Sequence, residues 1–129
     1  MKTAQLERML AQHVLWLRST EPGMPIAAKE GTRADFNGMD LREHVHAFNR
    51  AELRYAQFSG AVLSRLEFHN ADLRECNFHG AMMWGTDLRG AALHDADFEG
   101  AQIIGIKLSE RFEWNELRVA INVHKAIRE

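Results

Sequence analysis

Large apolar residues recur at every fifth position through the middle of the chain. A period of five fits neither the 3.6-residue repeat of an α-helix nor the two-residue repeat of a β-strand. In a chain that is 46% hydrophobic, a chance run of this length is of order one in ten thousand. The chain is therefore expected to turn a corner every five residues. The run consists of Phe48, Leu53, Phe58, Leu63, Phe68, Leu73, Phe78, Met83, Leu88, Leu93, Phe98, Ile103 and Leu108.

A second column, mostly of small residues, lies two positions before the large ones. Both columns are expected to point inward, with the small residue near a corner where only a small side chain fits. The other three positions of each unit face water, and glycine recurs at the corners, where its permissive dihedral angles ease the turn. Larger or polar residues occupy the small slot at His46, Leu66, Thr86 and Ile106. Local bulging is expected there.

Four such units close a square coil of about twenty residues, and successive coils stack at about 4.8 Å. Upstream, Phe36 and Leu41 continue the pattern, but Leu41 and Phe48 are seven positions apart. This spacing predicts a two-residue bulge within 43–47. The repeats then run over 33–109, which corresponds to about fifteen units and roughly four coils.

Residues twenty apart are expected to lie above one another in uniform ladders, as the core of a solenoid requires. Two interior columns define this core most clearly. One is the all-phenylalanine column Phe36, Phe58, Phe78 and Phe98, and the other is Leu53, Leu73 and Leu93.

The units ADLRE at 71–75, AALHD at 91–95 and ADFEG at 96–100 resemble the A(D/N)LXX repeats of the pentapeptide-repeat protein family. The resemblance implies an all-β solenoid, a right-handed quadrilateral β-helix. Its handedness comes from the resemblance alone, because a period does not determine it.

Helices are expected on both sides of the repeats. Residues 1–20 carry a broad apolar stripe that includes Leu6, His13 and Trp16, and they predict an amphipathic helix capping the open first coil. Residues 21–32 form a linker. Residues 110–129 have apolar positions at helical spacing and predict a C-terminal helix. Coil edges pair uncontrollably unless covered, whereas in several relatives that end is the dimer contact, so capping and dimerisation compete for this helix.

One outer face differs from the others by its apolar outward positions, which are Val62, Met82, Trp84 and Ile104. Three readings are open for such a patch: a terminal helix lies across it, a second copy of the chain binds it, or a different protein binds it. All three predict that Trp84 is buried. The face opposite carries Arg54 and Arg74 beside Glu52 and Asp72, which favours a solvated, self-paired surface over a phosphate-binding strip.

Charge and composition narrow the classes of partner and the cellular compartment that fit this chain. The net charge of −2 gives no basic footprint for nucleic acid. The single cysteine, Cys76, cannot form an internal disulfide, which together with six methionines favours a reducing compartment. No apolar run approaches the ~20 residues of a membrane span, and the N-terminus lacks a signal-peptide core. We therefore expect a cytoplasmic protein that contacts no membrane.

Candidate chemistry is sparse. His69, His79 and His94 fall on three different faces, and the close pair His44 and His46 lacks a third ligand, so no metal site is expected. There is no glycine-rich phosphate loop with its lysine, and no nucleophile with a recognisable base. Cys76 occupies an inward small slot as an inert core thiol. No catalytic residue and no cofactor are expected.

The sequence therefore predicts a non-catalytic protein-interaction or scaffold module, of bacterial origin, with an unidentified protein partner. A homodimer through the C-terminal helix or through the face that carries Trp84 is a further expectation. The alternative is the branch of the family that mimics DNA, binds DNA gyrase and confers quinolone resistance. Those relatives are strongly negative, whereas this near-neutral chain intersperses Arg42, Arg54, Arg74 and Arg89 among its acids.

Overall fold

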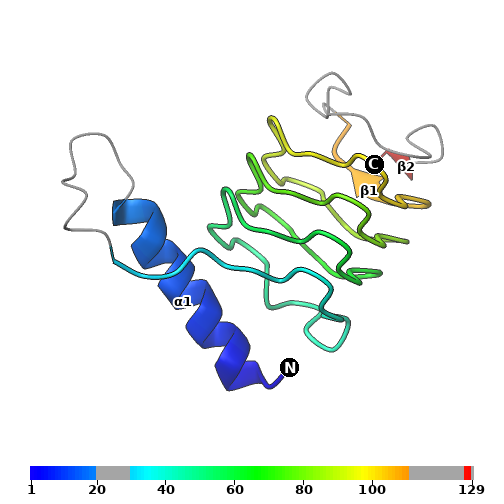
Figure 1. Ribbon diagram of the computed structural model, residues 1–129. Coiled ribbons are helices and arrows are strands. Elements are labelled where there is room, and N and C mark those ends of the chain that lie inside the picture. Colours follow the sequence, from blue (N-terminus) through cyan, green and yellow to red (C-terminus); the bar gives the residue numbers. More distant parts are fainter. Residues whose placement is uncertain (20–29, 111–126, 129) are drawn as a thin grey trace.

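A computed structural model describes residues 1–19, 30–110 and 127–128 of the chain. Helix α1 spans Thr3–Ser19, and two short parallel strands, β1 (Lys107–Leu108) and β2 (Ile127–Arg128), pair with each other. Between α1 and β1 the chain winds through stacked coils (Figure 1). Their sides are isolated parallel bridges between turns, because a five-residue unit leaves room for little more than one bridging residue.

The bridges fix the register of the coils. Glu52 pairs with Asp72, and Asp72 pairs with Ala92, so residues twenty apart lie one above the other. In the first coil the offset is larger, because Asp35 pairs with Gln57 across 22 positions. The difference of two confirms the two-residue insertion predicted between Leu41 and Phe48. A coil of twenty residues with five per side is four-sided, which gives a β-helix-type fold.

Each side ends in a tight turn. At one corner the N–H of Ala51 donates to the C=O of Phe48 at 3.1 Å, and Arg50 between them has a φ of 61°. A left-handed third residue is the signature of a type II turn. The same bond joins Ala56 to Leu53 at 2.8 Å. The five-residue period is therefore a rung followed by a type II corner.

The four faces are named here by what they carry, and each is defined by its inward residues. The Phe face is Phe36, Phe58, Phe78 and Phe98. The Trp84 face is Leu41, Leu63, Met83 and Ile103. The His69 face is Phe48, Phe68, Leu88 and Leu108. The helix face is Leu53, Leu73 and Leu93. All of these side chains are at most 2% exposed.

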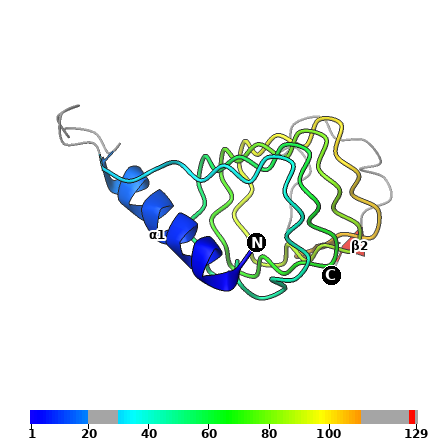
Figure 2. The ribbon, with the colours of Figure 1, turned by 60° about the horizontal axis from the view of Figure 1, so that its bottom comes forward.

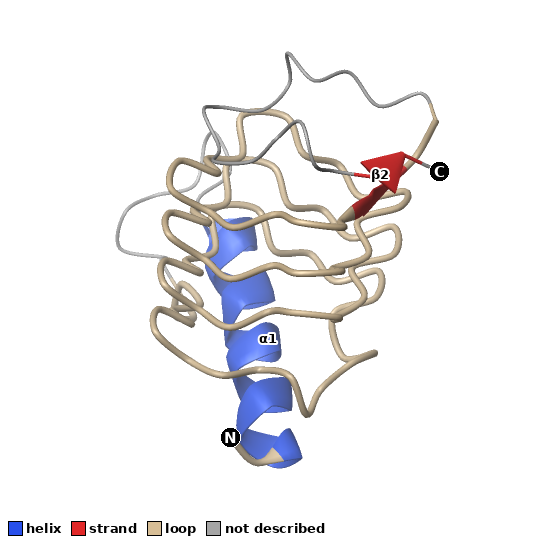
Figure 3. Cartoon of the chain, turned by 90° about the vertical axis from the view of Figure 1, so that its right-hand side faces the viewer, coloured by secondary structure: helices blue, strands red, loops and turns tan. Residues whose placement is uncertain are grey.

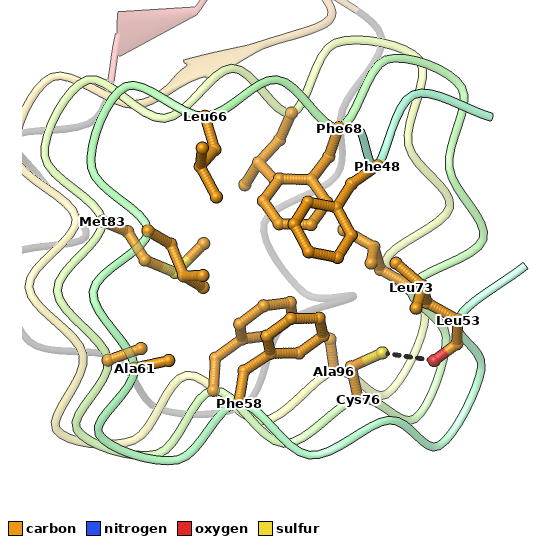
Figure 4. Packing of buried hydrophobic residues seen from close by; sticks show 14 of the residues in the cluster. Phe48, Leu53, Phe58, Ala61, Leu66, Phe68, Leu73, Cys76, Met83 and Ala96 are labelled. Atoms are coloured by element: carbon orange, nitrogen blue, oxygen red, sulfur yellow. Dashed lines mark hydrogen bonds between the residues drawn. The ribbon is translucent and has the colours of Figure 1, made fainter. Parts of the chain in front are cut away.

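The predicted phenylalanine column is confirmed. Ring centroids on the Phe face are 5.1 Å apart for Phe36 and Phe58, 5.1 Å for Phe58 and Phe78, and 4.8 Å for Phe78 and Phe98, with the rings nearly parallel. Phe48 and Phe68 form a second stack at 5.2 Å, and its rings meet the first stack edge to face. Figure 4 shows Phe48, Phe58 and Phe68 pointing into the interior of the coil.

The bulging expected where the small slot is overfilled is wrong for three of the four positions. Leu66, Thr86 and Ile106 are fully buried, and the ladder passes through them with bonds such as Asp87 N–H to Leu66 C=O at 2.9 Å. Together with His46 they are spaced twenty apart, so one corner column is wider on every coil and no single coil has to distort.

Polar atoms in the small slots are satisfied by the coil below. The hydroxyl of Thr86 donates to the C=O of Leu63 at 2.8 Å, and the thiol of Cys76 donates to the C=O of Leu53 at 2.9 Å (Figure 4). In both cases the acceptor is 23 positions earlier. Burial raises the pKa of the Cys76 thiol. This cysteine is therefore a protonated core residue.

Helix α1 runs beside the coils at the helix face, near the open first coil (Figures 2 and 3). Leu6 is 1% exposed and belongs to the core, while Met9 and Leu10 pack against it. Phe36 and Leu41 in the first coil are fully buried. None of the helices in the described part of the chain has the length and apolar character needed to cross a membrane.

His13 joins α1 to the coil by two bonds. Its Nδ1 accepts from the N–H of Ala34 and its Nε2 faces the C=O of Arg54, each at 2.9 Å. Because Nδ1 is an acceptor, the proton lies on Nε2, which donates to Arg54. In the coil above, the C=O of Arg74 accepts from the N–H of Tyr55. Within the described residues, no backbone N–H donates to the C=O of Arg54 at the lower end of the helix face. The imidazole takes the place of that missing hydrogen bond.

The C-terminal helix predicted over 110–129 falls mostly outside the described residues. At Ile127–Arg128 the chain forms strand β2, not a helix, and Ile127 pairs with Lys107 twenty positions earlier. This pairing continues the register of the coils onto the last edge of the His69 face.

Candidate functional site: the Trp84 face

The four predicted patch residues lie on one face, the Trp84 face. Val62 bridges to Met82, and Met82 bridges to Gln102, so the first two share a ladder. Trp84 and Ile104 share the neighbouring column, one coil apart. Trp84 is 47% exposed and Ile104 is 41% exposed. Val62 and Met82 are half-buried.

Backbone bonds on both sides hold Trp84 in place at its corner. Its C=O accepts from the N–H of Arg65 at 2.9 Å, and its N–H donates to the hydroxyl of Ser64 at 3.3 Å. The next residue, Gly85, donates to the C=O of Ile104 at 2.9 Å. The indole therefore projects from a backbone that hydrogen bonds hold in place.

A hollow of about 690 Å³ lies beside the indole. It extends from the Trp84 face to the two-residue insertion, where Val45 is 36% exposed. Its floor is apolar and its rim carries two arginines. The lining residues are Arg42, Val45, Ser64, Arg65, Met82, Trp84 and Gly85.

Both arginines of the hollow are positively charged, but within the described residues only one of them is paired with a carboxylate. Arg42 is bound to Asp40 through Nε at 2.9 Å and through its terminal nitrogen at 2.7 Å. The guanidinium lowers the pKa of Asp40 to about 2. Arg65 is exposed and forms no ion pair with any residue of the described ranges, and its stem lies over Gly85. The hollow therefore offers one unneutralised cation beside its apolar floor.

The predicted burial of Trp84 is not observed among the described residues, where the side chain is 47% exposed. Helix α1 packs at the helix face, which is opposite, and so does not cover the indole. The reading in which the C-terminal segment covers Trp84 falls on residues outside the described ranges. The C-terminal segment, a second copy and a different protein partner therefore all stay open as the group that would bury it.

The helix face confirms one of its two expected ion pairs. Arg74 forms a two-pronged bond to Asp72 at 2.8 and 2.7 Å. Arg54 instead lies 5.1 Å from the ring centre of Tyr55, and its buried Nε has no hydrogen-bond partner in the described part of the chain. Within the described residues, the expected pairing is therefore observed for Arg74 with Asp72 and not for Arg54.

The His69 face carries a polar network that the sequence reading missed. His69 Nε2 lies 2.6 Å from Asp87, which also accepts from Arg89 at 2.9 and 2.6 Å. Burial alone would raise the pKa of Asp87, but the bonds from Arg89 and His69 hold it far below its usual value. A second carboxylate, Glu67, accepts from His46 at 2.7 Å. The carboxylates of this face are therefore already satisfied.

The expected scatter of the histidines is observed, with His69, His79 and His94 on three different faces. What the sequence reading missed is that a histidine can meet carboxylates from neighbouring coils. His79 lies within reach of Asp97 and Glu99. The spacing of twenty between 79 and 99 was the signal that would have found this group.

A comparison with known protein families identifies the repeat. Residues 47–80 and 71–109 match a family described as pentapeptide repeats, with eight copies. A similar solved structure is a pentapeptide repeat protein from the thylakoid lumen of Arabidopsis thaliana, with 22% identity and a TM-score of 0.46. The similarity covers 67% of this chain and 59% of that one, so the chain spans less than two thirds of that protein. No curated protein matches the chain.

Proposed function

The chain belongs to the pentapeptide-repeat family, and we propose that it acts without catalysis, as a rigid module that docks a protein partner on its Trp84 face. In this proposal the coil is right-handed, with roughly four turns. The partner inserts one apolar side chain beside the indole and places a carboxylate on Arg65.

The observation that carries the proposal is the clustering of exposed apolar side chains. Four large hydrophobic side chains are exposed in the described part of the chain, and three of them, Val45, Trp84 and Ile104, lie on or next to the Trp84 face. Scattered exposed apolar residues are ordinary, whereas a contiguous set marks a binding surface. A fixed backbone beneath them lowers the entropic cost of association.

Charge decides the chemistry of the occupant. Arg65 is unpaired within the described residues, and the neighbouring Arg42 is neutralised by Asp40. A purely apolar segment would leave the Arg65 charge desolvated, which is costly. A segment that carries an aspartate or glutamate next to its apolar residue satisfies both the indole and the guanidinium. Tryptophan and arginine are also the residues most enriched among binding hot spots.

The test uses the full-length chain as bait for a displayed peptide library. Selected peptides are expected to combine an apolar residue with a carboxylate. Trp84→Ala and Arg65→Glu should each weaken their binding by at least about tenfold, which corresponds to ~1.4 kcal/mol. Partners captured from lysate count in support only if they show the same dependence.

Two matched variants control for general effects. Leu15→Ala removes an exposed apolar residue from α1, where Leu15 is 38% exposed. Arg50→Glu reverses a charge at the same corner position as Arg65, with a φ of 61° against 65°. Both should bind as the wild type does. Equal loss in Leu15→Ala, or full binding by Trp84→Ala, would refute the docking site.

Light scattering tests whether a second copy of the chain, and not a different protein, occupies the Trp84 face. A monomer is expected at micromolar concentration for the wild type and for Trp84→Ala. A wild-type dimer that Trp84→Ala dissociates would show that a second copy occupies the face, and the partner proposed here would be wrong.

A further inference from the structure

His79, Asp97 and Glu99 bring three metal-ligating groups together on the outer side of the Phe face. One ligand atom from each lies within 4.8 Å of the others. His79 Nε2 is 3.4 Å from a carboxylate oxygen of Glu99. The three side chains come from two successive coils, so a ligand held by all of them would join those coils.

Backbone hydrogen bonds between the two coils lie on both sides of His79. The N–H of Phe78 donates to the C=O of Asp97 at 2.8 Å, and the N–H of Gly80 donates to the C=O of Glu99 at 3.0 Å. These two rungs bracket His79 between its coil neighbours. Under them the stacked rings of Phe78 and Phe98 fix the separation of the coils at the core.

The carboxylate of Asp97 is oriented by its own coil. One of its oxygens accepts from the N–H of Glu99 at 3.0 Å, which holds the group on the side of Glu99. The second oxygen makes no hydrogen bond to a side chain in the described ranges. The histidine backbone is held in the same way, because the N–H of His79 donates to the side chain of Asn77 at 2.9 Å.

The distances suit a small divalent cation. Zinc holds nitrogen and oxygen ligands at about 2.1 Å in tetrahedral geometry, which places neighbouring ligand atoms about 3.4 Å apart. The separation of His79 and Glu99 already has this value. Asp97 offers an oxygen within 4.8 Å of the other two ligand atoms, so it must move closer to complete the third edge. One imidazole with two carboxylates also matches the mixed nitrogen and oxygen preference of zinc among the common divalent ions.

Other histidines of the described coil lack this combination. On the His69 face, Asp87 is held by Arg89 and His69, and Glu67 is held by His46 and Asn49. His94 has one carboxylate partner, Asp95, at 3.3 Å. By contrast, no arginine or lysine in the described ranges neutralises Glu99.

We propose that His79, Asp97 and Glu99 form a surface site for a divalent transition-metal ion, with Zn²⁺ as its ligand. The ion links two successive coils through side chains that the ladder holds in register. The site is independent of the partner docking proposed above, because it lies on the Phe face and uses none of the residues of the Trp84 face.

The experiment titrates Zn²⁺ alone into the full-length chain in a chelator-free buffer near neutral pH. Calorimetry is expected to show one ion per chain, and Zn²⁺ is expected to raise the thermal midpoint, because an ion bound by the folded state stabilises it. His79→Ala and Glu99→Gln should weaken binding by at least about tenfold. Both side chains are at least half exposed, so neither variant threatens folding.

His94→Ala and His69→Ala serve as matched controls and should keep the wild-type affinity. Nitrogen chemical shifts of the imidazole rings provide a second readout, in which the ring of His79 alone should respond at equimolar Zn²⁺. Equal loss of affinity in His94→Ala or His69→Ala would overturn the site. So would unchanged affinity in His79→Ala, or the absence of both heat and shift changes in the wild type.

Discussion

Left-handed backbone recurs at the corners of the coil, and several of the residues there are not glycine. Arg50, Tyr55, Arg65, Asn70, Glu75 and Asp95 have φ values between 57° and 68°. The left-handed conformation costs an L-residue about 1–2 kcal/mol, less for asparagine and aspartate. The fold tolerates this cost because each corner is fixed by hydrogen bonds on both sides.

This strain predicts that Glu75→Gly stabilises the protein. Glycine removes the left-handed penalty. It also keeps the bond from the N–H of residue 75 to the C=O of His94, which is 3.1 Å long in the wild type. Glycine also gains unfolded-state entropy, which offsets part of the benefit. We expect a net gain of about 0.5–1 kcal/mol in the free energy of unfolding, measured by urea denaturation. Asn70→Gly should gain less. A lower denaturation midpoint for Glu75→Gly would contradict the strain.

The reverse substitution tests the same idea. A Cβ added at Gly60 meets nothing within 4 Å, and φ there is 66°. Gly60→Ala should therefore destabilise through conformation alone, by about 1 kcal/mol. Gly90→Ala should cost more, because the new Cβ would collide with the side chain of Asn70. If the two alanines cost the same, packing at Gly90 is unimportant.

In the core, Phe78→Ala should cost about 3–5 kcal/mol of unfolding free energy. Phe78 is fully buried, with Phe58 and Phe98 stacked on its two sides. The cavity cannot collapse, because the ladder holds the neighbouring coils apart. Ile104→Ala, at an exposed position, should leave the denaturation midpoint unchanged. An unaltered midpoint for Phe78→Ala would contradict the stacking.

The inward residues were predictable from the sequence because position alone determines them. A period of five assigns Phe58 and Phe78 to the core whatever the neighbouring residues are. The corner strain at Tyr55 and Glu75 was not predictable, since the pattern of glycines suggested that corners require glycine. Asp72 and Arg74 are two positions apart in the sequence. Their pairing can be predicted only when both side chains are known to point outward from the same side of the coil.

At the scale of elements, a buried histidine joins α1 to the coil by hydrogen bonds, beside the apolar contacts of Leu6. His13 is fully buried, and its ring stacks on Trp16 with centroids 5.5 Å apart. Burial lowers the pKa of His13 from its ordinary value of 6.5, and the charge of Arg33 acts in the same direction. A proton on Nδ1 would also point at the N–H of Ala34. The neutral ring is therefore required for the bond pattern that holds α1.

This predicts that stability falls as the solution becomes acidic. Below pH 6.5 the unfolded chain takes up a proton on His13 that the folded chain resists. The unfolded state then binds more protons, so the free energy of unfolding decreases as pH falls. His13→Gln keeps a donor and an acceptor but does not titrate. Between about pH 8 and about pH 5.5, the wild type should lose more stability than His13→Gln, by urea denaturation. Parallel pH profiles would contradict this role.

The sequence predicted an amphipathic helix at the N-terminus, and α1 occupies Thr3–Ser19. The place where it packs was harder to predict. The apolar stripe includes His13 among leucines and methionines, and a histidine there reads as one more semi-apolar residue. Only the register of the coils shows that the C=O of Arg54 lacks a rung below it. The role of His13 follows from that vacancy in the ladder and not from its sequence neighbours.

At the scale of the whole molecule, the distribution of charge bears on the DNA-mimicking alternative. Three units repeat the same two-pronged contact, in which an aspartate accepts from the arginine two positions later. The contacts are Asp40 with Arg42, Asp72 with Arg74, and Asp87 with Arg89, and their shortest distances are 2.6–2.7 Å. Duplex DNA carries one negative charge per ~1.7 Å of its axis. These pairs remove the carboxylates that a mimic would have to display.

We therefore expect no inhibition of DNA gyrase supercoiling by the wild-type chain at micromolar concentration, with or without ciprofloxacin. Replacing Arg42, Arg74 and Arg89 together by glutamine removes the arginine from each of the three carboxylates, although Asp87 keeps its contact with His69, and makes the surface more negative by three charges. If negative charge on a coil of this width were enough for mimicry, the triple variant would inhibit where the wild type does not. Inhibition by the wild type itself would show that pairing does not mask these carboxylates. The function would then be gyrase binding, and the apolar Trp84 face would not be the principal binding surface.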